Sequence, residues 1–299
     1  LNQAWLFFTP GVTFEFKQMV TQQFVPFFKD LLLKEADQHP GQRDLTTRLH
    51  KFLTLGHGES SLADKIKILP LPEGITLGYR PSAPHVEIKV FARGKQASTA
   101  MDSFLPLLRT TLDTAVVSER FPFISQEVHA LMLESGLTLS LAESCSGGML
   151  SSQLVEYPGS SNYLQQSLVT YSNAAKSRVL GVPEGVLEEH GAVSIATAQA
   201  MALGARKLLD SDLALAITGI AGPEGGSEAK PVGTVVIALA DRSNTWTQTV
   251  NLGQRSRTLV RTMSCAVALD MLRRLLLQQD PLVVYPFIPA RETRVEKRH

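Results

Sequence analysis

The sequence predicts an α/β protein, in which a layered α/β domain with a mixed sheet follows a small α+β module. From about residue 123 to residue 280, helical segments alternate with short apolar segments that are typical of buried strands. Upstream, Val86, Ile88 and Val90 alternate with charged residues, which is the period of a half-buried strand. With 299 residues, the chain is long enough for more than one hydrophobic core.

Composition excludes several classes of protein. Hydrophobic residues make up 44% and charged residues 19%, a globular balance without a bias toward disorder. The net charge of +1 argues against nucleic-acid or membrane-surface binding through a basic face. No apolar run is long enough to span a membrane, and no signal peptide opens the sequence.

Two cysteines and seven histidines bear on compartment and metal content. Cys145 and Cys265 show no paired spacing, so we expect a reducing, cytoplasmic compartment without disulfides. The histidines show no ligand spacing, so we expect no metal. No Walker loop or dinucleotide fingerprint occurs, and no cofactor is expected.

Residues 1–42 do not form a whole domain. An apolar strand is expected at residues 4–8, and a helix should follow the turn at Pro10 and Gly11. One strand and one helix cannot bury a core, so this segment should dock on missing N-terminal sequence or on a partner subunit. Because the chain opens on Leu1, we expect the numbering to begin inside a longer protein.

The remaining chain divides into four parts. Residues 43–96 form the small module, with a segment at 45–53 that is helical or strand-like and a hairpin marked by Pro81 and Pro84. Residues 97–122 are expected to be a connecting helix, residues 123–280 the larger domain, and residues 281–299 a tail with an unstructured end. In the larger domain we expect strands at 137–142, 166–171, 213–217, 233–240 and 245–252, and helices at 126–134, 147–155, 194–209 and 255–276.

Ser144 is the first candidate for chemistry, because it stands where a strand ends and Gly147 and Gly148 open a helix. Such a side chain faces the crevice at the carboxyl end of the sheet, and helix N–H groups there can bind an anion or a developing oxyanion. Helix capping is the alternative role for this serine. Cys145 is a rival nucleophile, although a buried filler is the more usual role of such a cysteine.

Tyr171 and Lys176 form the second candidate pair, since Tyr171 ends a strand and Lys176 begins the next helix. A lysine whose pKa is lowered by burial can act as the base for a serine, and a tyrosine can relay or orient the proton. The alternatives are a solvated helix lysine and a half-buried strand aromatic.

The third candidate is the glycine-rich loop at residues 217–226, which follows an apolar strand. Its backbone N–H groups can form a nest for a phosphate, although an ordinary surface loop is the alternative. Arg255 opens the last helix and could clamp a phosphate or carboxylate, or simply face solvent. We expect His190 to lie at the end of a helix.

Five motifs in this order resemble the CinA C-terminal domain, the nicotinamide-nucleotide amidase family. They lie at residues 142–148, 169–176, 190–194, 218–223 and 230–235. Residues 9–15 with Met19 resemble the end of the molybdopterin-binding-like domain that precedes them in CinA proteins. Gly58-Glu59-Ser60 and the strand ending at Gly94 resemble the family's KH-like module. The chain therefore looks like a CinA-like protein lacking most of its first domain.

The resemblance implies hydrolysis of the carboxamide of nicotinamide mononucleotide, a small-molecule partner, by a protein that is at least a homodimer. It implies Ser144 as nucleophile, Lys176 as base and Tyr171 as its helper. The substrate-binding residues that it implies are Cys145, Ser146, Gly147, Gly148, Thr218, Gly219, Gly222, Gly225, Gly226 and Arg255.

Some residues depart from the family's pattern. Ser146 replaces a threonine, and Gln254 replaces the aspartate of a Gly-Asp-Arg motif, while Arg257 and Arg261 have no clean register. The competing hypothesis is therefore a catalytically weak paralogue that binds a nucleotide or serves as an interaction module. RNA binding by the small module is disfavoured, because it lacks a Gly-x-x-Gly clamp.

Overall fold

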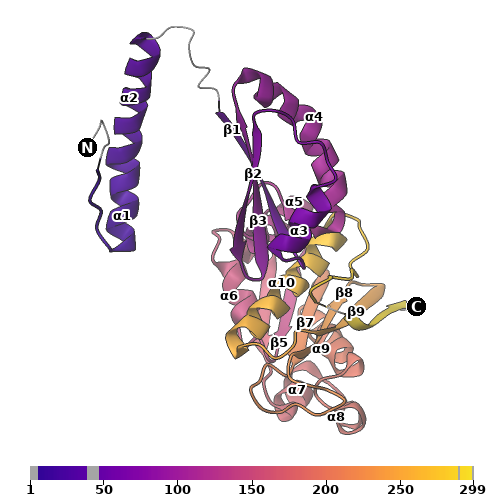
Figure 1. The fold of residues 1–299 in the computed structure, drawn as a ribbon. Helices are drawn as coiled ribbons and strands as arrows, with labels where there is room; N and C mark the ends of the chain where they lie inside the picture. The colour runs from indigo at the N-terminus through magenta and orange to yellow at the C-terminus, as the bar shows by residue number, and fades with distance from the viewer. Residues whose placement is uncertain (1–5, 39–46, 289, 298–299) are drawn as a thin grey trace.

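The computed structural model describes residues 6–38, 47–288 and 290–297. Its first segment is helical, as predicted: α1 (Thr13–Met19), η1 (Val20–Phe24) and α2 (Val25–Gln38) follow one another directly (Figure 1). Phe7 packs on it, with its ring 4.8 Å from that of Phe24 and 5.4 Å from that of Phe28. Of the strand expected at residues 4–8, residues 6–8 are not strand, and the others lie outside the described residues.

The small module is a four-stranded antiparallel sheet in the order β2-β3-β1-β4. Its elements are β1 (Thr47–Leu55), α3 (Glu59–Ile66), β2 (Ile75–Ser82), β3 (His85–Arg93), α4 (Lys95–Leu112), η2 (Asp113–Ala115) and β4 (Val116–Ser118). The ambiguous segment at 45–53 is thus a strand where it is described, and the hairpin predicted from Pro81 and Pro84 is confirmed.

The helix expected at residues 97–122 is present as α4 up to Leu112, but it is part of this module and not a connection. Its apolar residues recur at helical spacing, and Met101, Phe104 and Leu108 are buried against Phe52 and Ile88 of the sheet. The chain then returns to the sheet as β4, which pairs with β1. A helix with an apolar stripe is more stable on a sheet face than as a spacer in water.

The larger domain is built on a six-stranded mixed sheet in the order β10-β9-β8-β7-β5-β6, and the predicted fold class is confirmed. β5, β6 and β7 are parallel, and β8, β9 and β10 are antiparallel to their neighbours. The strands are β5 (Leu139–Glu143), β6 (Leu164–Val169), β7 (Leu213–Gly219), β8 (Thr234–Ala240), β9 (Asn244–Asn251) and β10 (Ala290–Lys297).

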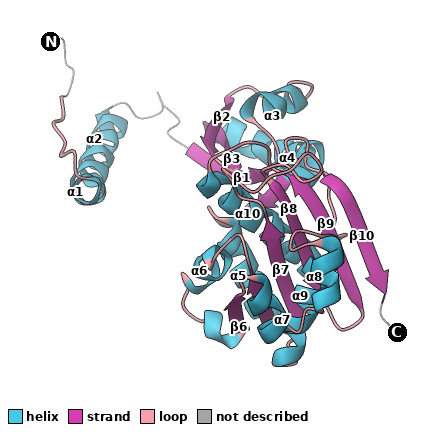
Figure 2. Cartoon of the chain, turned by 90° about the horizontal axis from the view of Figure 1, so that it is seen from below, coloured by secondary structure: helices cyan, strands magenta, loops and turns pink. Residues whose placement is uncertain are grey.

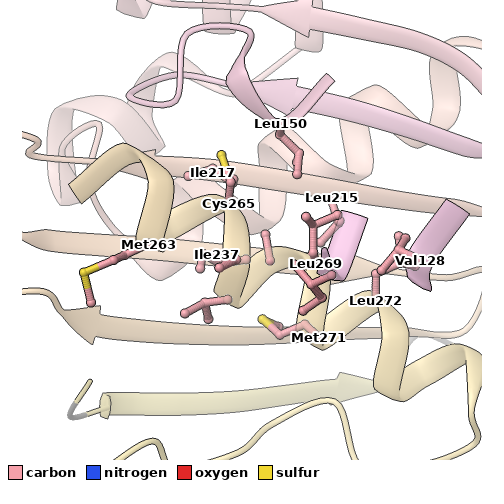
Figure 3. Close-up of a cluster of buried hydrophobic side chains, with 14 of the residues drawn as sticks. Val128, Leu150, Leu215, Ile217, Ile237, Met263, Cys265, Leu269, Met271 and Leu272 are labelled. Atoms are coloured by element: carbon pink, nitrogen blue, oxygen red, sulfur yellow. The ribbon is translucent and has the colours of Figure 1, made fainter. Parts of the chain in front are cut away.

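Helices cover both faces of this sheet (Figure 2). The first face packs on α5 (Ile124–Ser135), α6 (Met149–Val155) and α10 (Arg257–Leu276), and the second on α7 (Asn173–Leu180), α8 (Glu184–His190) and α9 (Ile195–Leu208). Side chains alternate along β7: Leu215 and Ile217 enter the first core (Figure 3), and Ala214 and Ala216 enter the second. The small alanines let α9 approach the sheet closely.

The C-terminal tail is ordered as a strand, so the expectation of an unstructured end is wrong for residues 290–297. β10 pairs with β9 from Ala290 opposite Val250 to Lys297 opposite Asn244. Without it, β9 would present a row of unpaired N–H and C=O groups at the sheet edge. The sequence of this strand is mostly charged and lacks the apolar pattern of a buried strand, because an edge strand needs little apolar surface.

One apolar core joins the two units. Leu53 and Leu55 of β1 and Val117 of β4 belong to the same buried cluster as α5 and α10 of the larger domain. No helix in the described residues is long and apolar enough to cross a membrane, and within the same residues no group of three or more His, Cys, Asp or Glu side chains could hold a metal ion.

Candidate active site

Ser144 lies on the predicted strand–turn–helix, one residue after β5 ends and just before α6. Its backbone N–H donates to the Ile217 carbonyl of β7 at 2.9 Å, which fixes the turn against the neighbouring strand. Gly147 and Gly148 have φ values of +58° and +87°, a left-handed conformation that favours glycine. The Ser144 side chain is only 8% exposed and opens into a cavity of about 190 Å³.

The side chain of Glu143 accepts hydrogen bonds from the free N–H groups at the start of α6, which a ligand was expected to accept. Its fully buried carboxylate accepts N–H bonds from Gly148 at 2.9 Å, Leu150 at 3.1 Å and Ser151 at 2.9 Å. The expectation that these helix N–H groups face the substrate is therefore wrong. The capping alternative for Ser144 is also wrong, because the N-cap residue of α6 is Gly148 and the side chain that accepts the helix N–H groups is Glu143.

Lys176 lies in the first turns of α7, and its side chain reaches the serine. Nζ is 3.1 Å from Ser144 Oγ, 2.9 Å from the Thr170 carbonyl and 3.3 Å from the Tyr171 carbonyl. The residue is 1% exposed, and this burial lowers the pKa of the Lys176 amine below its usual 10.5. A neutral amine can donate its two hydrogens to the carbonyls and turn its lone pair toward Ser144 Oγ.

Cys145 lies next to the serine but in an environment that opposes its ionisation. Burial raises the pKa of its thiol to about 12, although the charges of Arg257 and Lys176 act in the opposite direction. A thiol with that pKa is protonated near neutral pH and is a weak nucleophile. The geometry thus favours Ser144 over Cys145.

Tyr171 and Arg257 form a second contact across the cavity. Arg257 donates from one guanidinium nitrogen to the Tyr171 hydroxyl at 2.6 Å and from another to the Gly222 carbonyl at 2.8 Å. Tyr171 is 59% exposed, and its carbonyl, rather than its hydroxyl, contacts Lys176. Arg257 therefore ties the start of α10 to the glycine-rich loop and to the strand end that precedes α7.

The cavity contains only some of the predicted residues. Ser144, Cys145, Tyr171, Lys176, Thr218 and Gly219 line it, together with Ala192, Val193, Ala221 and Arg257. The other predicted binding residues, Ser146, Gly147, Gly148, Gly222, Gly225 and Gly226, are not among its lining residues. The carbonyl of Ser146 instead accepts two bonds from Arg261, at 3.1 and 2.7 Å.

Residues 122–276 match the family described as the CinA C-terminal domain. The chain belongs to this family. A CinA-like protein of Shewanella sp. (strain ANA-3) is 58% identical over 288 residues, which are 96% of this chain and 66% of that protein. A Shewanella oneidensis protein named nicotinamide-nucleotide amidohydrolase PncC is 57% identical, with the same coverage of both chains. The chain thus spans 66% of the length of these relatives.

A solved structure supports the family's fold. The competence/damage inducible protein CihA from Agrobacterium tumefaciens is 40% identical and matches with a TM-score of 0.50. The match covers 54% of this chain and 100% of that one.

The sequence pointed to the wrong arginine at the start of the last helix. Arg255 occupies the expected register, but it lines another cavity, between the small module and α10, and its Nε donates to the Leu252 carbonyl at 2.8 Å. Arg257 takes the place beside Tyr171. The sequence held a signal for this, because the motif after Gly253 had no clean register, but only the path of the loop shows which arginine turns inward.

Proposed function

We propose that the chain hydrolyses the carboxamide of nicotinamide mononucleotide, giving nicotinate mononucleotide and ammonia, with Ser144 as nucleophile and Lys176 as base. The observation that carries this proposal is the 3.1 Å contact between Lys176 Nζ and Ser144 Oγ inside a cavity. The name of the Shewanella oneidensis relative supports the same substrate.

The first half of the reaction acylates the serine. Neutral Lys176 takes the hydroxyl proton as Ser144 Oγ attacks the carboxamide carbon. When the tetrahedral intermediate collapses, the C–N bond breaks, and Lys176 returns the proton to the departing nitrogen, which leaves as ammonia. A nicotinate ester of Ser144 remains.

The second half uses one water molecule. Lys176 accepts a proton from the water as its oxygen attacks the ester carbon, and the proton returns to Ser144 Oγ when the ester bond breaks. Tyr171 and Arg257 hold the substrate in this scheme, and Thr218 and Gly219 form the opposite wall of the cavity. The Arg257 contact gives Tyr171 a positioning role rather than that of a proton relay.

We further propose a cytoplasmic homodimer. Two buried free thiols, Cys145 and Cys265, suit a reducing compartment. Exposed apolar side chains of the first helical segment, such as Phe14, Phe16 and Phe28, suit a surface that a second copy of the chain covers.

Ammonia release from the mononucleotide tests the proposal. We expect Ser144→Ala to lower kcat by a factor on the order of a thousand or more, since it removes the only nucleophile in the scheme. Cys145→Ala is the matched control and should keep most of the activity. Equal rates for the wild type and Ser144→Ala would eliminate Ser144 as nucleophile.

A catalytically weak, nucleotide-binding paralogue is the second candidate, and the replacement of an aspartate by Gln254 favours it. Calorimetric binding of the mononucleotide by the wild type without ammonia release would support it. A healthy turnover rate of the wild type would exclude it.

A further inference from the structure

A second and larger cavity lies beside the proposed active site. Its volume is about 350 Å³, and it shares Val193 with the active-site cavity. The active-site cavity is lined by Thr218 of β7 and the second cavity by Val236 of β8, and these two residues pair across the neighbouring strands. We call it the α9 cavity, since Ser194, Ile195 and Ala196 at the start of α9 line it. The helix α9 lies on the sheet face against β7 and β8 (Figure 2).

Charged side chains line the α9 cavity. The basic residues Lys230, Arg294 and His190 line it, and so does one carboxylate, that of Glu292. Lys230 is held in place, because its Nζ donates to the His190 carbonyl at 2.8 Å. Arg294 is paired with Glu296, whose Oε1 lies 3.0 Å from its Nε, whereas Lys230 forms no ion pair within the described residues. The charge of Lys230 therefore favours a ligand that carries negative charge.

The start of α9 adds backbone donors to this cavity. Ser194 Oγ accepts the Thr197 N–H at 3.2 Å, whereas the N–H groups of Ile195 and Ala196 belong to the first turn, which no carbonyl of the helix serves. With 14 residues, α9 has an N-terminal dipole that favours an anion.

Thr234 is an independent sign of a ligand. The residue is 4% exposed, and within the described part of the chain its Oγ1 has no hydrogen-bond partner. It lines the α9 cavity from the same face of β8 as Val236, two residues along the strand. A buried hydroxyl without a partner destabilises a fold, and an oxyanion in the cavity would satisfy it.

We infer that the α9 cavity is the phosphate subsite, which takes the phosphate monoester of the substrate while the carboxamide lies at Ser144. This inference rests on the proposed function. The active-site cavity of about 190 Å³ is smaller than the roughly 300 Å³ at which small-molecule pockets usually begin, so a whole nucleotide extends beyond it. The α9 cavity lies next to it and supplies cations, backbone donors and a hydroxyl.

Comparing two substrates isolates the phosphate. Nicotinamide riboside has the same carboxamide and ribose as the mononucleotide but no phosphate. We expect Lys230→Ala and Arg294→Ala each to lower kcat/KM for the mononucleotide by about 10- to 100-fold, which is what one charged hydrogen bond contributes, and to leave kcat/KM for the riboside unchanged. Lys207→Ala, an exposed lysine in the last turn of α9, is the matched control and should change neither value.

Thr234→Val separates binding from folding. The substitution keeps the shape of the side chain and removes the unpaired hydroxyl, so a purely structural threonine would leave KM unchanged. We expect thermal stability to be retained and KM to rise for the mononucleotide alone.

Direct binding distinguishes this inference from the amidase proposal. Inorganic phosphate titrated into Ser144→Ala should bind, and adding Lys230→Ala should abolish the binding heat. Suppose that the wild type hydrolyses the mononucleotide. If the Lys230 and Arg294 variants then lower kcat/KM equally for both substrates, or for neither, the subsite inference fails and the amidase proposal stands. If no substrate is turned over, phosphate binding that depends on Lys230 still supports the subsite, and phosphate binding that is absent or unchanged by the variant overturns it.

Discussion

Burial of the Lys176 amine sets the expected pH dependence of the reaction. Its folded-state pKa is below 10.5 because desolvation penalises the charged form. The base works only when neutral, so kcat/KM should rise with pH and level off above the folded-state pKa. A pH–rate profile from pH 6 to pH 10 with the mononucleotide measures this rise.

Variants of Lys176 assign the titration. Lys176→Arg keeps a cation that does not deprotonate in this range, and it should be inactive throughout. A control at an exposed position, Lys207→Arg, should retain the wild-type profile. A kcat/KM that falls between pH 6 and the wild-type plateau, or substantial activity in Lys176→Arg, would contradict the assignment.

At the scale of elements, Glu143 couples strand β5 to helix α6 and thereby holds the turn that carries Ser144. Glu143→Gln leaves one acceptor oxygen and places an NH₂ donor against helix N–H groups. We expect a loss of about 1–3 kcal/mol in the free energy of unfolding, together with a lower kcat. Urea denaturation and ammonia release measure the two effects.

An exposed glutamate on another helix gives the control for this substitution. Glu134→Gln in α5 removes a charge from a surface ion pair with Arg120 and should change the free energy of unfolding by less than about 1 kcal/mol. If Glu143→Gln behaved like Glu134→Gln, the carboxylate would not organise the nucleophile turn.

Elements with a strong hydrophobic period were predictable, and elements defined by their partners were not. The apolar runs of β5, β7 and β8 identified the sheet because each strand is buried on both faces. The edge strand β10 was missed, since it has one neighbour and a charged composition. The hydrophobic period predicted that α4 is a helix, but it did not predict the sheet face on which α4 packs.

The same division applies to the site. Ser144 and Lys176 were identifiable, because a strand end beside a helix start fixes both positions locally. Three features depend on contacts between distant segments, such as the 2.6 Å bond from Arg257 to Tyr171. They are the cap from Glu143, the place of Arg257 rather than Arg255 in the site, and the α9 cavity. Spacing along the chain does not encode such contacts.

At the scale of the whole molecule, a buried polar network joins the C-terminal segment to α10. The Asp270 carboxylate is fully buried and accepts bonds from Arg273 Nε and from the Tyr285 hydroxyl, both at 2.7 Å. The Tyr285 ring lies against Gly56, where a Cβ would overlap it, and the Phe287 N–H donates to the Gly56 carbonyl at 3.1 Å. The small module, α10 and the C-terminal segment should therefore unfold together.

His85 lies at this junction and makes the stability of the whole fold sensitive to acid. Burial lowers the pKa of His85 from 6.5 to about 4, while the charge of Asp270 acts in the opposite direction. Between these two values the unfolded chain binds the proton and the folded chain does not, so the free energy of unfolding falls as the pH drops from 6.5 toward 4. The loss from this one group is at most about 3 kcal/mol.

The His85→Phe variant tests this acid sensitivity. Urea denaturation of the wild type and the variant at pH 6.5 and pH 4.5 gives the change in free energy of unfolding with pH for each. We expect a smaller change in the variant, although not zero, because burial also lowers the pKa of His57 and His129. The exposed His190 is the control position, and His190→Phe should keep the wild-type change. Equal changes in the wild type and His85→Phe would show that His85 protonates as readily in the folded protein as in the unfolded chain.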